Sequence, residues 1–190
     1  MGVFLVGSQA AFGASCTDQF IELMTDRTAK EPTKMFITQE IKGGTKTVNW
    51  NYQDGKGNWL TEMVEPANAQ WSMGLNNVLY TSTDQGKSWT KVRDMGDQNA
   101  AHKKSLDERA ETVKNASCGE AELDGVSYRT VEADYQMLGS FKADIHDKFW
   151  VNSKTGYVSR LETTMKNTAF ESFIIQELQP APDFVFPKVE

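Results

Sequence analysis

Histidine and cysteine are scarce in this 190-residue chain, with two residues of each. The two histidines stand far apart in the sequence, and His146 has Asp144 and Asp147 beside it. In a strand, Asp144 and His146 share one face while Asp147 points to the other, so at most two ligands meet where zinc needs three or four. We therefore predict no metal site and no cofactor, and we interpret Asp144 and His146 as part of a solvated strand face.

The sequence motifs of common enzyme classes are missing as well. There is no G-x-S-x-G turn to present a serine nucleophile and no glycine-rich loop to bind phosphate. Carboxylates are plentiful, with 26 Asp and Glu residues, but the sequence does not bring two of them together as the pair that a glycosidase needs. We therefore predict that the protein is not an enzyme.

A basic surface, long apolar runs and internal repeats are also lacking. The net charge is −6, whereas binding to a phosphate backbone needs a basic surface. No stretch approaches the ~18 apolar residues of a membrane-spanning helix, and no repeat or linker divides the chain. We predict a single, monomeric domain over residues 15–190 that binds no nucleic acid and has no transmembrane segment.

The N-terminus resembles the end of a secretory signal. A short apolar run, Val3 to Val6, is followed by small residues around position 12 that suit a signal peptidase, although no Lys or Arg precedes the run. We therefore predict that residues 1–14 are the remnant of a signal peptide and that the protein is exported. A frayed apolar N-terminus is one alternative. A lipid anchor on Cys16 is a weaker one, because the Leu of a lipobox is absent.

The two cysteines, Cys16 and Cys118, stand near the start and the middle of the chain. In an exported protein an even number of cysteines favours a disulfide, whereas in a cytoplasmic protein they would remain separate thiols. A disulfide here would close a loop of about 100 residues and, in the chain-entropy model, would stabilise the fold by up to about 4–5 kcal/mol.

Two stretches show the features of helices. Residues 15–30 begin with a capping box, Ser15 with Asp18, and continue with an apolar stripe at helical spacing. Residues 97–116 begin with Asp97 as a predicted N-cap. The apolar stripe of this second helix is sparse, which indicates a helix that lies over a sheet with shallow burial.

The remaining sequence has the pattern of antiparallel strands. Residues 34–93 and 118–178 alternate between apolar and polar positions, with short turns between the runs. The alternation slips near Thr130, which indicates either a β-bulge or a strand buried on both faces. Strands that recur with such short gaps favour a meander rather than βαβ units.

The clearest strand-turn-strand pattern covers residues 141–165. Its turn lies at 152–156, where Gly156 can take a positive φ. Its first strand has apolar side chains on one face, namely Phe141, Ala143, Ile145, Phe149 and Val151.

A short motif at residues 82–89, STDQGKSW, resembles the Asp-box hairpin of sialidase-type propellers. In that hairpin Asp84 would accept backbone N–H bonds, Gly86 would take a positive φ, and Trp89 would pack beneath the turn. A propeller needs several copies of its blade, and the sequence has one such motif. We interpret it as a stable turn.

The hairpin over residues 149–156, FWVNSKTG, with Arg160 and Leu161 after it, is similar to one common in the LolA/LppX-type lipoprotein carriers. The closing segment at 183–187, DFVFP, resembles their terminal segment, and the placement of the cysteines resembles small periplasmic proteins of Gram-negative bacteria. The resemblance implies an α+β fold with a strongly curved antiparallel sheet. That sheet is an open, unclosed barrel whose concave face is covered by the N-terminal and mid-chain helices.

Family members use that cavity for acyl chains or other lipids, and this chain is rich in side chains that suit it. It has eight Met, five Trp and ten Phe residues, and Met repacks readily around varied apolar ligands. Ordinary core filling would explain the same residues. The candidates for lining a cavity are Met24, Met35, Trp50, Met63, Leu106, Ala110, Val113, Tyr135, Met137, Phe149 and Leu161.

We therefore predict an exported periplasmic protein that binds a hydrophobic ligand, a lipid or acyl chain, in the cavity of a curved sheet. The alternative is an interaction module of the cell envelope that has a filled core, holds no small ligand and binds a protein partner through a sheet edge or outer Trp residues.

Overall fold

The computed structural model describes residues 14–25, 31–139 and 141–189. In this part of the chain it contains two α-helices and eleven β-strands. The helices are α1 (Cys16–Thr25) and α2 (Gln98–Ala110). The strands are β1 (Thr33–Ile41), β2 (Lys46–Gln53), β3 (Trp59–Glu65), β4 (Trp71–Leu75), β5 (Val78–Ser82), β6 (Thr90–Asp94), β7 (Lys114–Leu123), β8 (Val126–Met137), β9 (Ala143–Asn152), β10 (Val158–Lys166) and β11 (Glu171–Pro180).

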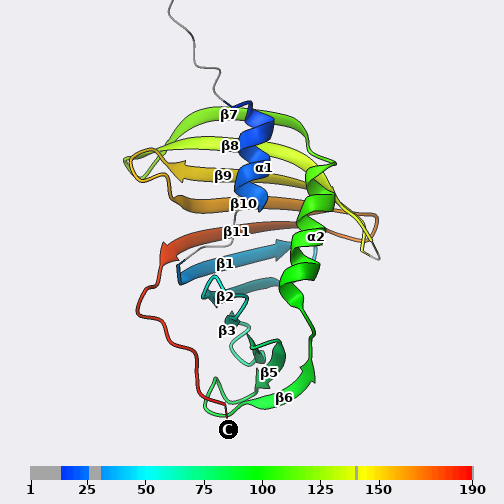
Figure 1. Ribbon diagram of the computed structural model, residues 1–190, viewed down its shortest axis with the longest axis vertical. Coiled ribbons are helices and arrows are strands. Elements are labelled where there is room, and N and C mark those ends of the chain that lie inside the picture. The colour runs from blue at the N-terminus through cyan, green and yellow to red at the C-terminus, as the bar shows by residue number, and fades with distance from the viewer. Residues whose placement is uncertain (1–13, 26–30, 140, 190) are drawn as a thin grey trace, which may run out of the picture.

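All eleven strands of the described residues belong to one antiparallel sheet, in the order β6-β5-β4-β3-β2-β1-β11-β10-β9-β8-β7. Neighbours in the sheet are neighbours in the sequence except at the centre, where β1 pairs with β11 along its whole length. The sheet curves strongly and its two end strands do not meet, while both helices lie on one side of it (Figure 1). This confirms the predicted α+β class and the open, curved sheet.

Both helices begin where the sequence predicts, and α2 ends earlier than predicted. Helix α1 starts with the capping box, in which the Ser15 hydroxyl accepts from the Asp18 N–H at 3.1 Å. Of the residues predicted to extend it, 26–30 lie outside the described residues. Asp97 caps α2 by accepting from the N–H of Ala100 at 3.0 Å.

Helix α2 ends at Ala110, so its predicted extension to residue 116 is wrong. The Thr112 hydroxyl donates to the carbonyl of Arg109 and accepts from the backbone N–H of Gln136 on β8. Asn115 then has a φ of 56°. These contacts turn the chain into β7, because side-chain bonds of this kind compete with the next helical turn.

The register divides the sheet into two faces, because directly opposed residues of an antiparallel pair point to the same side. Phe149 is opposed to Leu161 on β10 and to Val131 on β8. These three side chains belong to one buried cluster with Phe20 and Met24 of α1. We call this side of the sheet the helix face and the opposite side the outer face.

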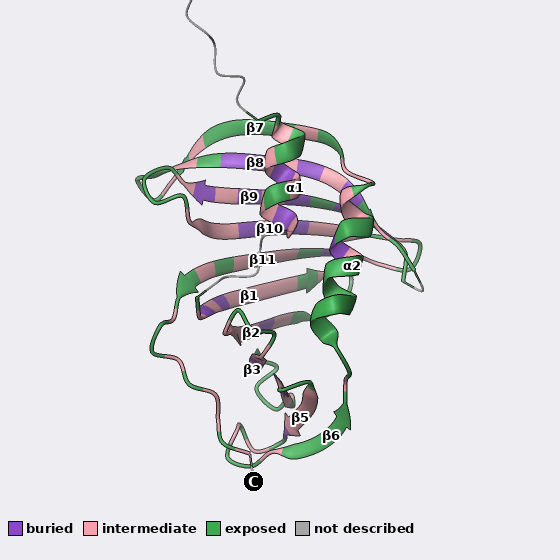
Figure 2. Ribbon diagram, viewed as in Figure 1, coloured by how far each residue is buried: buried purple, intermediate pink, exposed green. Residues whose placement is uncertain are grey.

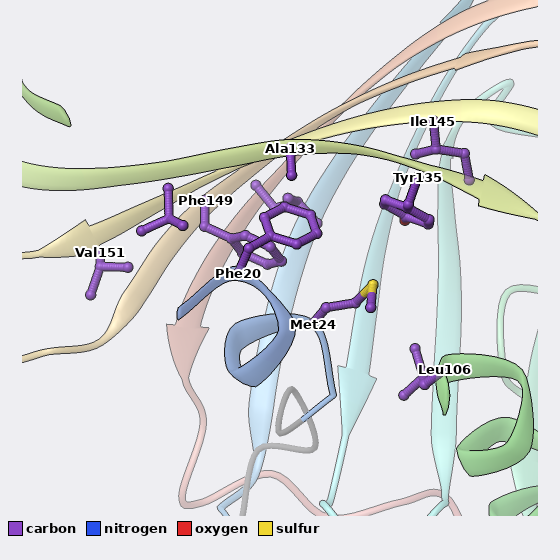
Figure 3. Packing of buried hydrophobic residues seen from close by; sticks show 10 residues of the cluster. Phe20, Met24, Leu106, Ala133, Tyr135, Ile145, Phe149 and Val151 are labelled. Atoms are coloured by element: carbon purple, nitrogen blue, oxygen red, sulfur yellow. The ribbon is translucent and has the colours of Figure 1, made fainter. Parts of the chain in front are cut away.

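The main core lies between the helices and β8–β10 (Figure 2). Figure 3 shows Phe20 and Met24 pointing from α1 toward Phe149 and Tyr135 on the sheet. Strand β8 pairs with β9 without a register shift, and Thr130 and Val131 are both buried. The slip in alternation near Thr130 therefore marks burial on both faces of a regular strand.

A second apolar layer lies on the outer face of the other half of the sheet. Its buried residues are Val48 on β2, Leu60 on β3 and Met73 on β4, with Leu60 opposed to both Tyr52 and Met73. The C-terminal segment covers part of this layer, because the ring of Phe184 stacks on Tyr52 at 4.3 Å. The apolar side of the sheet thus changes from one face to the other along its width.

The Asp-box motif forms a compact turn, as predicted. Asp84 accepts from the N–H of Ser88 at 2.9 Å and from its hydroxyl at 2.6 Å. Gly86 has a φ of 82°, and a Cβ there would clash with the ring of Trp71. Trp89 lies beside the same glycine.

In the structure the sulfur atoms of Cys16 and Cys118 lie at disulfide-bonding distance, as predicted. Cys16 is the first residue of α1 and Cys118 lies on the edge strand β7, with their Cα atoms 5.6 Å apart. The link therefore holds the start of α1 against the edge of the sheet.

Candidate functional site

A cleft of about 1010 Å³ lies between α2, the end of α1 and the turn that joins β2 to β3. Gln53 and Trp59 form its floor on the helix face of these two strands. The turn between them approaches the start of α2 closely, because a side chain at Gly57 would clash with Asn99. Asn99 donates to the carbonyl of Lys56 across this contact at 3.4 Å.

The lining of the cleft changes from polar to apolar along α2. Residues three or four apart share one side of a helix. The side of α2 that lines the cleft begins with Gln98 and Asn99, continues with His102 and Lys103, and ends with Leu106, Asp107 and Ala110. Ile21 of α1 lies at the apolar end, where Leu106 also belongs to the main core. The cleft can therefore hold a molecule with one apolar and one polar end.

Two lining residues carry full charges at neutral pH, and they pair with each other. Lys103 Nζ lies 2.6 Å from Asp107 Oδ2, one helical turn along α2. Both side chains are well exposed, so the pair contributes at most a few tenths of a kcal/mol to stability. The pair therefore adds no net charge to the lining of the cleft.

The structure separates the predicted cavity residues into groups. Leu106 and Ala110 line the cleft. Met24, Tyr135, Phe149 and Leu161 are buried in the main core, with Val113 and Met137 packed against them.

The other three candidates lie outside both the cleft and the main core. Met35 and Met63 are on the helix face of β1 and β3, because Met35 is opposed to Asn51 and Met63 to Asn49. Trp50 points to the outer face, where its ring packs on Phe36 at 4.8 Å.

The most deeply buried charged side chain of the described residues is Asp147, which is 2% exposed on the helix face of β9. Its carboxylate accepts hydrogen bonds from the hydroxyls of Tyr135, at 2.9 Å, and Thr163. We did not identify it from the sequence, although it occupies the gap in the apolar series of residues 143–151. Asp144 and His146 lie on the outer face instead.

On that outer face His146 Nδ1 lies 2.8 Å from Asp134 Oδ1. Hydrogen bonds from Asn115 and then from His146 hold the pKa of Asp134 below its ordinary value. The face is exposed to solvent, as the sequence indicates.

Sequence reasoning also missed the polar residues of the cleft, Gln53, Asn58, Gln98 and Asn99. They lie in a turn, at a strand end and in the first turn of a helix, where periodicity carries no signal. The one usable sign was the change from polar to apolar residues along the stripe of α2.

No family model matches the chain, and a search of curated proteins found no match. Among solved structures, the chain is similar to a LolA superfamily protein from Nitrosomonas europaea, at 8% identity and a TM-score of 0.38, over 88% of this chain and 94% of that one. It is also similar to a domain from Vibrio parahaemolyticus named for sorting outer membrane lipoproteins, at 8% identity and a TM-score of 0.40, over 89% and 92%. Neither helix of the described residues is long and apolar enough to cross a membrane.

Proposed function

We propose that this protein binds a lipid or acyl chain in the cleft beside α2, without chemistry, as an exported protein of the bacterial periplasm. The observation that supports this is the cleft of about 1010 Å³, which is apolar at one end and polar at the other. Ligand sites of proteins usually span about 300–1,000 Å³ and combine an apolar wall with a few polar groups.

The apolar end of the cleft supplies the driving force for binding. Ile21, Leu106 and Ala110 would cover the chain of the ligand, and each methylene removed from water contributes about 0.8 kcal/mol. Phe20, Phe149 and Leu161 are fully buried against their neighbours. For this reason the proposal assigns the ligand to the cleft beside the main core.

A neutral fluorescent probe, N-phenylnaphthylamine, tests the site, because its emission rises in apolar surroundings. We expect saturable binding to the wild-type protein. Ala110→Phe would fill the apolar end and weaken binding by roughly tenfold, equivalent to about 1.4 kcal/mol. Ala101→Phe is the matched control, since Ala101 lies on the same helix but is exposed and does not line the cleft.

Native mass spectrometry of protein purified from its own envelope would identify a natural ligand. Added mass that dissociates as a lipid supports the proposal. Equal probe affinity of the Ala110→Phe and Ala101→Phe proteins would exclude the cleft as the site, and absence of any saturable binding would exclude the function.

A second candidate function is that of an interaction module of the cell envelope, which binds a protein partner. A group of exposed apolar residues favours this function. Leu138 and Phe141 follow the end of β8 and are 46% and 42% exposed, and the ring of Phe141 stacks on Phe170 at 5.5 Å. Contiguous apolar side chains on a protein surface can form a contact with a partner. If the protein binds neither the probe nor a lipid, this candidate becomes the better one.

A further inference from the structure

The helix face of β2–β4 is polar, unlike the helix face of β8–β10. Asn49, Asn51 and Gln53 project from β2. Thr61 on β3 is opposed to Asn51, and Ser72 on β4 is opposed to Thr61. We call these five side chains the polar platform. All five are half-buried, so the platform is neither open surface nor core.

The platform is continuous with the floor of the cleft, because Gln53 belongs to both. Its side chains are already ordered by hydrogen bonds: Asn51 Nδ2 donates to the Thr61 hydroxyl at 2.9 Å, and Gln53 Nε2 donates to Asn51 Oδ1 at 3.1 Å. Trp59 lies beside it over Gly74, where a Cβ would clash with the indole. The glycine allows the indole to lie close to the sheet at the edge of the platform.

The platform carries no charge. Within β2, β3 and β4, all of whose residues the structure describes, the helix face holds the platform, Thr47, Trp59, Met63 and Gly74, none of which ionises at neutral pH. The ion pair of Lys103 and Asp107 at the cleft is neutral in sum. A phosphate or carboxylate headgroup would find no unpaired lysine or arginine among these residues.

We propose that the polar platform and Trp59 bind the glycosyl headgroup of an amphiphile whose chain occupies the apolar end of the cleft. Sugar hydroxyls both donate and accept hydrogen bonds, as do carboxamides and the hydroxyls of Thr and Ser. The apolar side of a sugar ring can lie against the indole of Trp59. An ion would lose hydration here without gaining a counter-charge, which is costly. This inference rests on the proposed function, since it assigns the headgroup of the same ligand.

Three amphiphiles with the same ten-carbon chain test the proposal, namely decyl maltoside, decanoate and decyltrimethylammonium. Each is titrated, below its micelle concentration, against N-phenylnaphthylamine bound to the full-length protein. We expect decyl maltoside to bind at least roughly tenfold more tightly than either ion, because a desolvated and unpaired charge costs more than about 1.4 kcal/mol.

Two variants locate the effect. Thr61→Val keeps the shape of the side chain and suits a strand, but it removes a hydroxyl from the platform. We expect it to weaken the binding of decyl maltoside by roughly three- to tenfold, the effect of losing one hydrogen bond. Gln53→Lys adds a cation, and we expect it to shift the preference toward decanoate. Ala100→Lys, on the exposed surface of α2, is the matched control for charge.

The outcomes separate this inference from the proposed function. Equal displacement by all three amphiphiles, or a preference for decanoate in the wild type, overturns the glycosyl assignment and leaves chain binding intact. Failure of every amphiphile to displace a bound probe overturns both. A selective loss of decyl maltoside affinity in Thr61→Val supports the platform as the headgroup site.

Discussion

Asp147 depends on two hydroxyl groups for its place in the main core. Tyr135 and Thr163 supply these donors to a carboxylate that water does not reach. Removing one partner of a buried charged group leaves part of its desolvation uncompensated.

We therefore predict that Tyr135→Phe lowers the free energy of unfolding by about 1–3 kcal/mol. Tyr128→Phe is the control, since Tyr128 lies on the outer face against Trp150, and it should change stability by less than about 0.5 kcal/mol. Urea denaturation followed by tryptophan fluorescence measures both. Equal effects of the two substitutions would show that the Tyr135 hydroxyl is not needed by the carboxylate.

At the scale of the element, helix α1 is held at its first residue by the link from Cys16 to Cys118. We predict that Cys16→Ser/Cys118→Ser lowers the free energy of unfolding by about 2–5 kcal/mol, as is usual for a native disulfide. Chemical denaturation of the variant and of the wild type, with and without reductant, gives the difference. If reductant leaves the wild-type midpoint unchanged, the link does not stabilise the fold.

The Asp-box turn makes the stability of the β5–β6 hairpin depend on pH. The hydroxyl and N–H of Ser88, and then the hydroxyl of Ser82, donate to the Asp84 carboxylate and hold its pKa well below the ordinary value. Because the pKa is lower in the folded state, the stabilisation is present above the unfolded value of about 3.9 and is lost as the pH falls below it.

We therefore predict that Asp84→Ala lowers the melting temperature at pH 7. We expect the difference in melting temperature between this variant and the wild type to be smaller at pH 3. Circular dichroism melts at the two pH values give the comparison. A difference that stays constant with pH would mean that the carboxylate charge does not stabilise the turn.

The sequence predicts single elements better than it predicts how they combine. Alternation in residues 143–151 identified the buried face of β9, since each strand reports its own period. The end of α2 was missed because it depends on a bond between Thr112 and Gln136, which are far apart in the sequence.

The polar platform was missed for a related reason. Alternation in β2 identifies an apolar face that includes Val48 and Trp50, and we assigned Trp50 to a cavity under the helices. Which side of the sheet that face occupies is decided by pairing with β1 and by cover from Phe184, more than 130 residues further along the chain. The period of a strand fixes its two faces but not their neighbours.

For the whole molecule, the apolar layers on opposite faces give the two halves of the sheet different sources of stability. The half that contains β2–β5 relies on the C-terminal segment, through the stacked rings of Phe184 and Tyr52. We predict that Phe184→Ala lowers the free energy of unfolding by about 1–3 kcal/mol. We also expect Phe184→Ala to accelerate amide hydrogen exchange more in β2 and β3 than in β9.

Val185→Ala is the matched control, because Val185 is 81% exposed beside the same residue. It should change stability by less than about 0.5 kcal/mol. Uniform acceleration of exchange in both halves after Phe184→Ala would contradict the assignment of the tail to one half.

The pairing of β1 with β11 also sets the order in which the fold can be completed. One ladder runs from β1 to β6 and the other from β7 to β11, and the two join in the sheet where Thr33 is opposed to Pro180. Closing contacts between such distant residues slows folding. During synthesis, β1 cannot pair with β11 until this last strand has been made. The centre of the finished sheet is therefore the last part of it to form. A chain with this connection completes its sheet later than a sequential meander of the same length would.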